Sequence, residues 1–257
     1  MKQVVIHFMN LYEELKNKAI VITGASSGVG RAAALEFARY EPALILAARS
    51  EETLNEVAHE CERLGATVLV VTTDVTDPGS VINLANAAND WAGRIDVWIN
   101  NAGVLAAGEF SHTPVEVHEQ VIRTNLLGYI YGAHAVMPIF KTQQSGILIN
   151  NISIGGYLPV PYSAGYSASK FGLRGFSEAL KAELAVWPHI HVCDLYPAFL
   201  DTPGIRHAGN YTNKVLKPSP PVYDPKLVAE AMVKVAASPR SNKYIGGASL
   251  ALKISHA

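Results

Sequence analysis

Short apolar runs alternate along the chain with longer segments in which apolar residues recur at helical spacing, and this alternation lasts from residue 18 to about residue 195. The short runs are rich in β-branched residues and almost wholly apolar, which is typical of strands buried on both faces of a parallel sheet. Strands that alternate with helices in this way predict βαβ units. We predict strands at 19–23, 43–48, 67–73, 95–100, 147–152 and 190–196, with 244–250 as a candidate seventh strand.

Residues that favour helix starts precede several of the helical segments. Ser50 and Asp77 are good N-caps, and each is followed by residues that suit the first helical turn. Thr113 with Pro114 and Glu116 predicts a capping box that opens a long helix. Together, strands and helices predict an α/β fold of the Rossmann type, a doubly wound parallel sheet of six to seven strands with helices on both faces.

The composition is that of a globular protein, with 49% hydrophobic and 17% charged residues. A net charge of −1 leaves no overall positive field to hold nucleic acid or an anionic membrane. Cys61 and Cys193 have no Cys or His at ligand spacing, so neither a disulfide framework nor a metal site is indicated, and we expect a cytoplasmic protein. No segment reaches the roughly 18 apolar residues of a membrane span. We expect one domain over 1–257, with 203–223 as a substrate lid.

A glycine-rich stretch follows the first predicted strand and leads into a helix. Its glycines permit a tight turn and a close approach of the backbone to a pyrophosphate, which the helix N-terminus would hold through its free N–H groups. An ordinary turn is the alternative for a glycine-rich loop considered alone. The residues that would bind a dinucleotide here are Gly24, Ser26, Ser27, Gly28, Val29 and Gly30.

This loop resembles that of the short-chain dehydrogenase/reductase family, in its single-domain oxidoreductase branch, and further motifs of that family follow in the family's order over about 180 residues. An ordered set of motifs is far more specific than any one of them. The resemblance implies that Asp74 and Val75 contact adenine, and that Asn101, Ala102 and Gly103 form a turn beside the cofactor. It also implies a catalytic set of four residues, which in this sequence are Asn125, Ser153, Tyr166 and Lys170.

The chemistry of these side chains suits exchange of a proton with a carbonyl or an alcohol. The Lys170 ammonium lies one helical turn from Tyr166 and favours the phenolate, so we expect the pKa of Tyr166 to be lowered. Tyr166 would then donate or accept the proton, while Ser153 hydrogen-bonds the same substrate oxygen. The resemblance implies that Lys170 also holds the nicotinamide ribose and that Asn125 supports a water-mediated proton relay. The alternative for Asn125 is a polar residue that satisfies backbone groups.

The end of the second predicted strand bears on the choice of cofactor. An NAD-selective site needs a carboxylate there for the ribose 2′-hydroxyl, whereas a 2′-phosphate needs a guanidinium. Ala48 stands where the acid is expected and Arg49 follows it, so NADP(H) is favoured over NAD(H), with Ser26 or Ser27 adding a hydrogen bond to the phosphate. The alternative is that Arg49 is a solvated residue before a helix.

A late segment also resembles the family pattern. Pro197, Leu200 and Thr202 match the stretch that lies along the nicotinamide carboxamide, although Ala198 replaces a glycine, which matters if that position needs a positive φ. The lid segment carries cations and no acid, which weakly favours an anionic or polar substrate, with a solvated loop as the alternative. These cations are Arg206, His207, Lys214 and Lys217.

The sequence thus predicts an NADP(H)-dependent oxidoreductase that interconverts a carbonyl and an alcohol of a small molecule. The resemblance implies a homodimer or homotetramer, formed through the long helices at 113–140 and 164–187. The alternative from another class is a regulatory protein that senses a dinucleotide without turnover, because fold does not fix function. The presence of all four catalytic residues argues against that alternative. Epimerisation or dehydration on the same scaffold is a third possibility.

Overall fold

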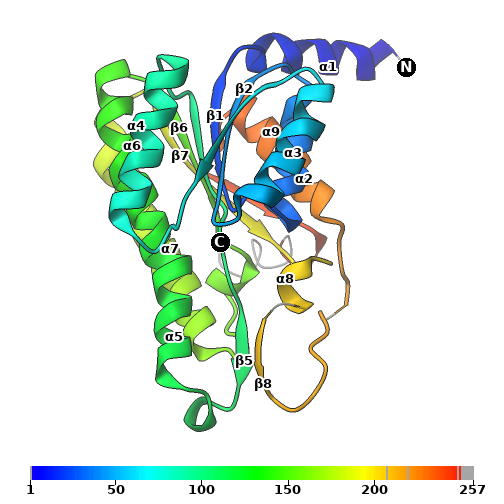
Figure 1. The fold of residues 1–257 in the computed structure, drawn as a ribbon, viewed down its shortest axis with the longest axis vertical. Coiled ribbons are helices and arrows are strands. Elements are labelled where there is room, and N and C mark those ends of the chain that lie inside the picture. The colour runs from blue at the N-terminus through cyan, green and yellow to red at the C-terminus, as the bar shows by residue number, and fades with distance from the viewer. Residues whose placement is uncertain (1, 207, 219, 248, 250–257) are drawn as a thin grey trace.

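The computed structural model describes residues 2–206, 208–218, 220–247 and 249 (Figure 1). The strands are β1 (Ala19–Thr23), β2 (Ala43–Ala48), β3 (Thr67–Thr72), β4 (Val97–Asn100), β5 (Ala106–Gly108), β6 (Gly146–Asn151), β7 (Ile190–Pro197), β8 (Gly209–Tyr211) and β9 (Asn242–Ile245). The α-helices are α1 (Lys2–Leu15), α2 (Gly28–Ala38), α3 (Glu51–Arg63), α4 (Pro78–Ala92), α5 (Val115–Ile122), α6 (Gly128–Gln143), α7 (Ala164–Glu183), α8 (Pro203–Arg206) and α9 (Pro225–Ala237). Shorter helical turns are Phe110–His112, Ile154–Gly156 and Leu184–Val186, and Arg123–Leu127 forms a π-helical turn.

One sheet of seven parallel strands runs through the molecule in the order β3-β2-β1-β4-β6-β7-β9. The chain winds outward in both directions from β1 and β4, and the carboxyl ends of strands at such a point form a crevice. The six predicted strands are confirmed, with ends that differ by at most two residues. The candidate strand at 244–250 begins earlier, as β9, and ends before Gly246, where φ is +92°. Residues 248 and 250 of that candidate lie outside the described residues.

Helices cover both faces of the sheet, as the sequence predicts (Figure 1). On one face α2, α3 and α9 bury a cluster that includes Phe37 and Met232. On the other face α4, α6 and α7 flank the sheet, and Trp98 and Phe140 lie in the cluster buried there. Helix α1, which the sequence analysis does not predict, packs against α9 and places Leu15 in the core. In the part of the chain described, no helix is long and apolar enough to cross a membrane.

Two of the three predicted helix starts are confirmed. The Ser50 hydroxyl accepts a hydrogen bond from the N–H of Thr53, and the Asp77 carboxylate caps the first turn of α4. The predicted capping box at Thr113 is wrong. Helix α5 begins later, at Val115, and the buried Thr113 hydroxyl instead donates to the carbonyl of Glu109 at 2.9 Å. Thr113 therefore closes the preceding helical turn and does not cap α5.

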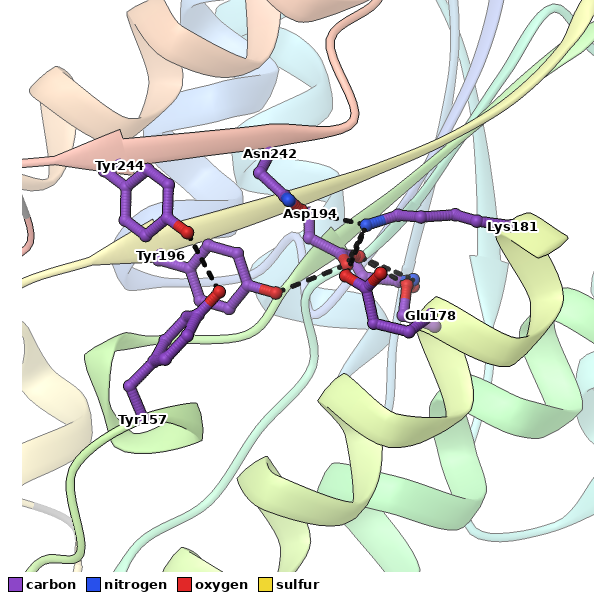
Figure 2. A network of polar contacts seen from close by, with 9 residues as sticks. Tyr157, Glu178, Lys181, Asp194, Tyr196, Asn242 and Tyr244 are labelled. Atoms are coloured by element: carbon purple, nitrogen blue, oxygen red, sulfur yellow. Dashed lines mark hydrogen bonds and ion pairs between the residues drawn. The ribbon is translucent and has the colours of Figure 1, made fainter. Parts of the chain in front are cut away.

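Polar side chains cross the interior of the sheet at one register position. Asn100 pairs with Asn150, Asn150 with Asp194, and Asp194 with Asn242 on four neighbouring strands. Hydrogen bonds join the first three, at 3.0 Å between Asn100 and Asn150 and 3.3 Å between Asn150 and Asp194. Lys181 of α7 bonds both Asp194 and Asn242, at 2.7 and 2.8 Å (Figure 2). We call Asn100, Asn150, Asp194 and Asn242 the polar ladder.

The segment predicted as a lid is attached to the body at both ends. Strand β8 pairs in parallel with β5, and Leu200 forms an isolated bridge with Tyr223. The N–H of Gly209 also donates to the carbonyl of Leu105 at 3.0 Å. Between these attachments, the described residues 212–218 and 220–222 are mostly exposed. His207 and residue 219 of the predicted lid lie outside the described residues.

Candidate active site

The turn after β1 can only be built with glycine at two positions. Gly24 has a φ of +66°, and a Cβ there would lie 2.8 Å from the Cα of Ala102 in the loop after β4. A Cβ at Gly30 would clash with the carbonyl oxygen of Gly24. Gly28, with a φ of +53°, is the first residue of α2, so the helix N-terminus faces the turn. This compact cradle is suited to the close approach of a pyrophosphate.

A cavity of about 790 Å³ opens at the carboxyl ends of the central strands. It brings together residues from the loops after β1, β2, β3, β4, β6 and β7, and from α5, α7 and the π-helical turn. Gly28 and Gly30 do not line it, and Gly30 is buried against the carbonyl of Gly24. The other sequence-predicted site residues all line it: Gly24, Ser26, Ser27, Val29, Arg49, Asp74, Val75, Asn101, Ala102, Gly103, Asn125, Ser153, Tyr166, Lys170, Pro197, Leu200 and Thr202.

One end of the cavity is polar and open. Arg49 is exposed beside Ser50 and forms no ion pair with any described residue. Asp74 lines the same cavity, and its carboxylate accepts hydrogen bonds from the N–H and the hydroxyl of Thr76, at 2.9 and 2.8 Å. Ser27 stands at the N-cap of α2 without a capping hydrogen bond of its own. The guanidinium of Arg49 and the hydroxyls of Ser27 and Ser50 are therefore placed to contact an anionic group.

Asn101, which follows β4, connects the ends of β1 and β6 through hydrogen bonds at the cavity wall. Its Nδ2 donates to the carbonyl of Thr23 at 3.1 Å, and its N–H donates to the Thr23 hydroxyl at 2.9 Å. Its Oδ1 accepts from Nδ2 of Asn151 at 2.9 Å. The other side-chain atom of Asn151, Oδ1, is buried with no partner. A buried acceptor costs free energy when it is unpaired, so the cavity wall offers a place for a hydroxyl donor of a bound group.

Ser153 lies at the end of β6 in a strained backbone conformation. Its φ is +112°, which non-glycine residues rarely adopt. Strain of this kind persists where the surroundings fix it, and it is common at functional sites. The Ser153 hydroxyl accepts from the N–H of Gly155 at 3.1 Å, and Gly155 in turn packs so close to Tyr166 that a Cβ would lie 2.9 Å from its ring. The turn thus holds Ser153 beside the phenol.

Tyr166 and Lys170 lie one turn apart on α7, inside the same cavity wall. Lys170 Nζ donates to the carbonyl of Asn151 at 3.2 Å and lies 5.8 Å from the ring centre of Tyr166. Burial lowers the pKa of Lys170 to about 7. Burial raises the pKa of the Tyr166 phenol, while a hydrogen bond with Ser153 opposes this change.

The expected lowering of the Tyr166 pKa by Lys170 is therefore not found. The reason is desolvation, which disfavours the charged forms of both groups. With a pKa of about 7, Lys170 carries only part of its positive charge at neutral pH, so it does little to stabilise a phenolate. In the protein without cofactor, burial therefore keeps the Tyr166 phenol protonated.

Asn125 lies in the π-helical turn between α5 and α6, which bends a helix at this point. Its Oδ1 accepts from the N–H of Val104, and its Nδ2 donates to the carbonyl of Val104, both at 2.8 Å. A longer contact of 3.4 Å leads from Nδ2 to the hydroxyl of Ser169. These contacts match the alternative that Asn125 satisfies backbone groups. The proton relay remains a prediction.

A family model described as short chain dehydrogenase matches residues 18–210, about three quarters of the chain. The chain belongs to the short-chain dehydrogenase family. The match spans the glycine turn, the Ser153 turn and the α7 residues Tyr166 and Lys170. The expected family is thereby confirmed, together with the Rossmann-like fold.

Relatives and solved structures agree with this membership. An uncharacterized oxidoreductase of Bacillus subtilis, YxnA, is 34% identical over 245 residues, covering 93% of this chain and 68% of that protein. The 3-ketodihydrosphingosine reductase of Bos taurus is 31% identical over 235 residues, covering 88% of this chain and 70% of that protein.

Two solved structures share the fold and were obtained with different cofactors. A short-chain dehydrogenase/reductase of Burkholderia phymatum in complex with NAD has a TM-score of 0.83 and 28% identity, covering 93% of this chain and 92% of that one. An alcohol dehydrogenase of Thermococcus sibiricus complexed with 5-hydroxy-NADP has a TM-score of 0.76 and 28% identity, covering 88% and 94%. Chains of this family thus bind either nicotinamide dinucleotide.

Alanine at 198 is accommodated without strain in this short-chain dehydrogenase. Ala198 is buried, and its backbone does not adopt a positive φ, so a glycine is not required. The space comes from Gly246, where a Cβ would lie 3.1 Å from the Cβ of Ala198. Pro197, Leu200 and Thr202 keep their places along the cavity. The departure from the family pattern therefore leaves the wall of the site intact.

Sequence reasoning misses several residues of this site. Tyr129 of α6 donates to the carbonyl of Asn151 at 3.0 Å, and its ring lies 5.2 Å from Lys170 Nζ, so one carbonyl holds both groups. Gln120 and Thr124 reach the cavity from the helical segment before Asn125 and are joined by a hydrogen bond of 3.2 Å. Tyr129 lies four residues after Asn125, and this spacing of one helical turn could have indicated it, whereas Gln120 and Thr124 have no such signal in the sequence.

A cluster of aromatic side chains supports the Ser153 turn from outside the cavity. Tyr157 donates to or accepts from the Tyr244 hydroxyl at 2.9 Å, and its ring meets Tyr196 edge-on at 4.9 Å (Figure 2). The guanidinium of Arg174 lies 4.0 Å from the Tyr157 ring centre. These contacts come from a loop, two strands and α7, and they fix the end of the turn that carries Ser153.

Proposed function

We propose that this short-chain dehydrogenase interconverts a carbonyl and an alcohol, with NADP(H) as the favoured cofactor, in one dinucleotide-binding catalytic domain. The observation that carries the proposal is the meeting of Ser153, Tyr166 and Lys170 on the wall of a cavity that also holds the glycine turn. A protein that only senses a dinucleotide has no use for a buried phenol beside a strained serine.

Each group has a role that follows from its surroundings. The Tyr166 hydroxyl donates its proton to the carbonyl oxygen in reduction, and the phenolate accepts one in the reverse direction. Ser153 hydrogen-bonds the same oxygen, and its strained turn holds the hydroxyl in place before substrate arrives. Asn125 positions the loop after β4 through Val104. A bound nicotinamide cofactor supplies or accepts the hydride.

The residues along the cavity fit such a cofactor. Gly24 leaves room for a pyrophosphate, Asn151 Oδ1 offers a buried acceptor, and Lys170 Nζ donates to the backbone carbonyl of the same Asn151. NADP(H) is favoured because Arg49 is exposed at the open end, where Ala48 and not an acid ends β2. Asp74 is engaged with Thr76 and supports an adenine contact through its loop.

The test is consumption of NADPH by the purified protein in the presence of a panel of ketones and aldehydes. Tyr166→Phe removes the phenolic hydroxyl and its exchangeable proton but keeps the ring, so turnover should fall by about 100-fold or more while NADPH affinity stays the same. Tyr12→Phe, on α1 and outside the cavity lining, is the matched control and should retain turnover. Equal turnover by the parent and Tyr166→Phe would rule out the assigned role, and cofactor binding without turnover would favour the sensor.

We also propose assembly into a dimer or tetramer through the long helices α5–α6 and α7. Phe171, on α7, exposes an aromatic ring on that surface. Sedimentation velocity of the parent and of Phe171→Ser tests this assembly, because loss of the ring should shift the protein toward smaller species. A single monomeric species in both samples would contradict it.

A further inference from the structure

The cavity is also lined by a group of apolar side chains, which we call its apolar end. They come from the loop after β4, the turn after β6 and the segment after β7: Val104, Leu105, Ile154, Val160, Phe199 and Ile205. Among the described lining residues, the charged side chains are Arg49, Asp74 and Lys170, which the cofactor and catalytic groups already account for. Lys214 and Lys217 of the predicted lid do not line the cavity. The described lining residues therefore offer no further cation to an anionic substrate.

Large apolar side chains continue outward from these walls onto the surface. Phe110 is 70% exposed and follows β5, which begins directly after Leu105. Tyr162, two residues after the lining residue Val160, is 67% exposed. Leu158, two residues before Val160, is also exposed. Tyr211 is exposed at the end of β8. Side chains of this size are rarely left in water together without a use.

Contacts through Gly108 join two of these residues, Tyr162 and Tyr211, and Phe110 lies two residues after Gly108 in the chain. The N–H of Gly108 donates to the carbonyl of Tyr162 at 2.8 Å, and Gly108 pairs with Tyr211 across the small parallel sheet. A Cβ at Gly108 would lie 2.6 Å from the Cβ of Tyr211, so the two chains touch. In Figure 1, β5 and β8 extend together beyond the end of the main sheet. We call Phe110, Leu158, Tyr162 and Tyr211 the collar.

We propose that the substrate is an uncharged ketone or alcohol with a long hydrocarbon chain, whose chain leaves the apolar end of the cavity and lies on the collar. This inference rests on the proposed function. It commits to the substrate as the occupant of the collar because the collar continues from lining residues on two separate loops. A short substrate would leave these side chains uncovered.

The test is a series of straight-chain methyl ketones, from butanone to dodecanone, each kept below its solubility limit with saturating NADPH. We expect kcat/KM to rise about two- to fourfold for each added methylene, since every buried methylene adds a similar increment of transfer free energy. Phe110→Ser and Tyr162→Asn should reduce the ratio of kcat/KM for dodecanone over butanone by about tenfold. Asn suits position 162 because the φ there is +62°. Val186→Ser, at a valine that is 80% exposed on the turn after α7, is the matched control and should keep the ratio.

Each outcome decides between the proposals. A kcat/KM that does not depend on chain length, with turnover still dependent on Tyr166, would overturn this inference and leave the proposed function standing. No turnover of any ketone would remove the proposed function and this inference with it. A change of oligomeric state in Phe110→Ser, measured by sedimentation velocity, would assign the collar to contacts between copies. Binding of the parent to phosphatidylcholine vesicles, lost in Phe110→Ser, would assign it to a lipid surface. Either result would overturn the inference.

Discussion

The side-chain amide of Asn125 bonds both backbone groups of Val104, its Oδ1 accepting from the N–H and its Nδ2 donating to the carbonyl, each at 2.8 Å. Val104 lies just past the turn that follows β4 and lines the cavity. The pairing therefore joins the π-helical turn to one wall of the site. An amide is the only side-chain group that offers a donor and an acceptor in this arrangement.

Replacement of Asn125 by alanine should destabilise the protein. Asn125 is fully buried, so its loss removes two hydrogen bonds and leaves the N–H and carbonyl of Val104 without partners. The cost should be about 2–4 kcal/mol in the free energy of unfolding, measured by urea denaturation. The exposed Asn55→Ala on α3 should change it by about 0.5 kcal/mol or less. A similar, small cost for both variants would contradict this account of Asn125.

Lys170 should make stability depend on pH in a defined window. Its pKa is about 7 in the folded protein against an ordinary value of 10.5, so between these values the unfolded chain binds a proton that the folded protein does not. Stability should therefore rise with pH across this window, by at most about 1.4 kcal/mol per pH unit. Urea denaturation of the cofactor-free protein from neutral pH up to pH ~9 measures the slope. Lys170→Met should flatten it, whereas the exposed Lys226→Met should not.

Tyr166 should give the two directions of the reaction opposite responses to pH. Because burial raises the pKa of its phenol, the group stays protonated through neutral pH and remains a proton donor. Ketone reduction should hold its kcat/KM until alkaline pH and then fall, while alcohol oxidation should rise over the same range. Ser153→Ala removes a hydrogen bond that lowers this pKa, so both profiles should move to higher pH. Profiles that keep their position in Ser153→Ala would argue against a bond between these two side chains.

Arg49 should decide between the two nicotinamide dinucleotides. Its guanidinium forms no ion pair with described residues and lines the open end of the cavity, so it is available to a 2′-phosphate. Arg49→Ala should weaken NADPH binding by about tenfold or more, or about 1.4 kcal/mol, and leave NADH binding almost unchanged. Titration calorimetry with both dinucleotides provides the measurement, and Arg39→Ala at the end of α2 is the control. An unchanged NADPH affinity in Arg49→Ala would show that Arg49 is a solvated residue that does not contact the cofactor.

Loss of Lys181 and loss of Asp194, which form an ion pair, should lower the free energy of unfolding by different amounts. The Asp194 side chain is 0% exposed, whereas that of Lys181 is 16% exposed and also pairs with Glu178 (Figure 2). Lys181→Met leaves a buried carboxylate without its cation and should cost about 3–5 kcal/mol. Asp194→Asn should cost less, because Lys181 keeps Glu178 and some solvent. Denaturation of the two variants at neutral pH compares them, and a larger cost for Asp194→Asn would reverse this reasoning.

The sequence predicts the sheet well because its strands are buried on both faces. A run such as Ile20 to Ile22 has no polar residue that would suit a helix surface, so its assignment needs no tertiary information. The order of the site motifs is likewise visible without tertiary information, because each motif follows the end of a predicted strand. Every predicted site residue except Gly28 and Gly30 lines one cavity, and these two shape the glycine turn, Gly28 through its positive φ and Gly30 through its close approach to Gly24.

Other features depend on contacts between distant segments and could not be predicted. Strands β5 and β8 consist of Ala-Ala-Gly and Gly-Asn-Tyr, which carry no strand signal, and they pair across about a hundred residues of sequence. Thr113 has the residue type of an N-cap, yet its hydroxyl donates a hydrogen bond to the carbonyl of Glu109 and does not cap α5. The pKa of Tyr166 was expected to fall, but burial outweighs a partly neutral Lys170, and burial is a property of the folded protein.

The polar ladder has a consequence for how the strands find their alignment. An all-apolar parallel sheet has little to distinguish one pairing of strands from a pairing shifted along the chain. Here a shift of β7 by one residue would turn Asp194 to the opposite face of the sheet, away from Asn150, Ser177 and Lys181. Such a misaligned sheet would carry an unpaired charge in its interior, at a large penalty. The ladder thus acts as an alignment key, and it sets Asn101 and Asn151, each directly after a ladder residue, side by side at the cavity, where they are hydrogen-bonded at 2.9 Å.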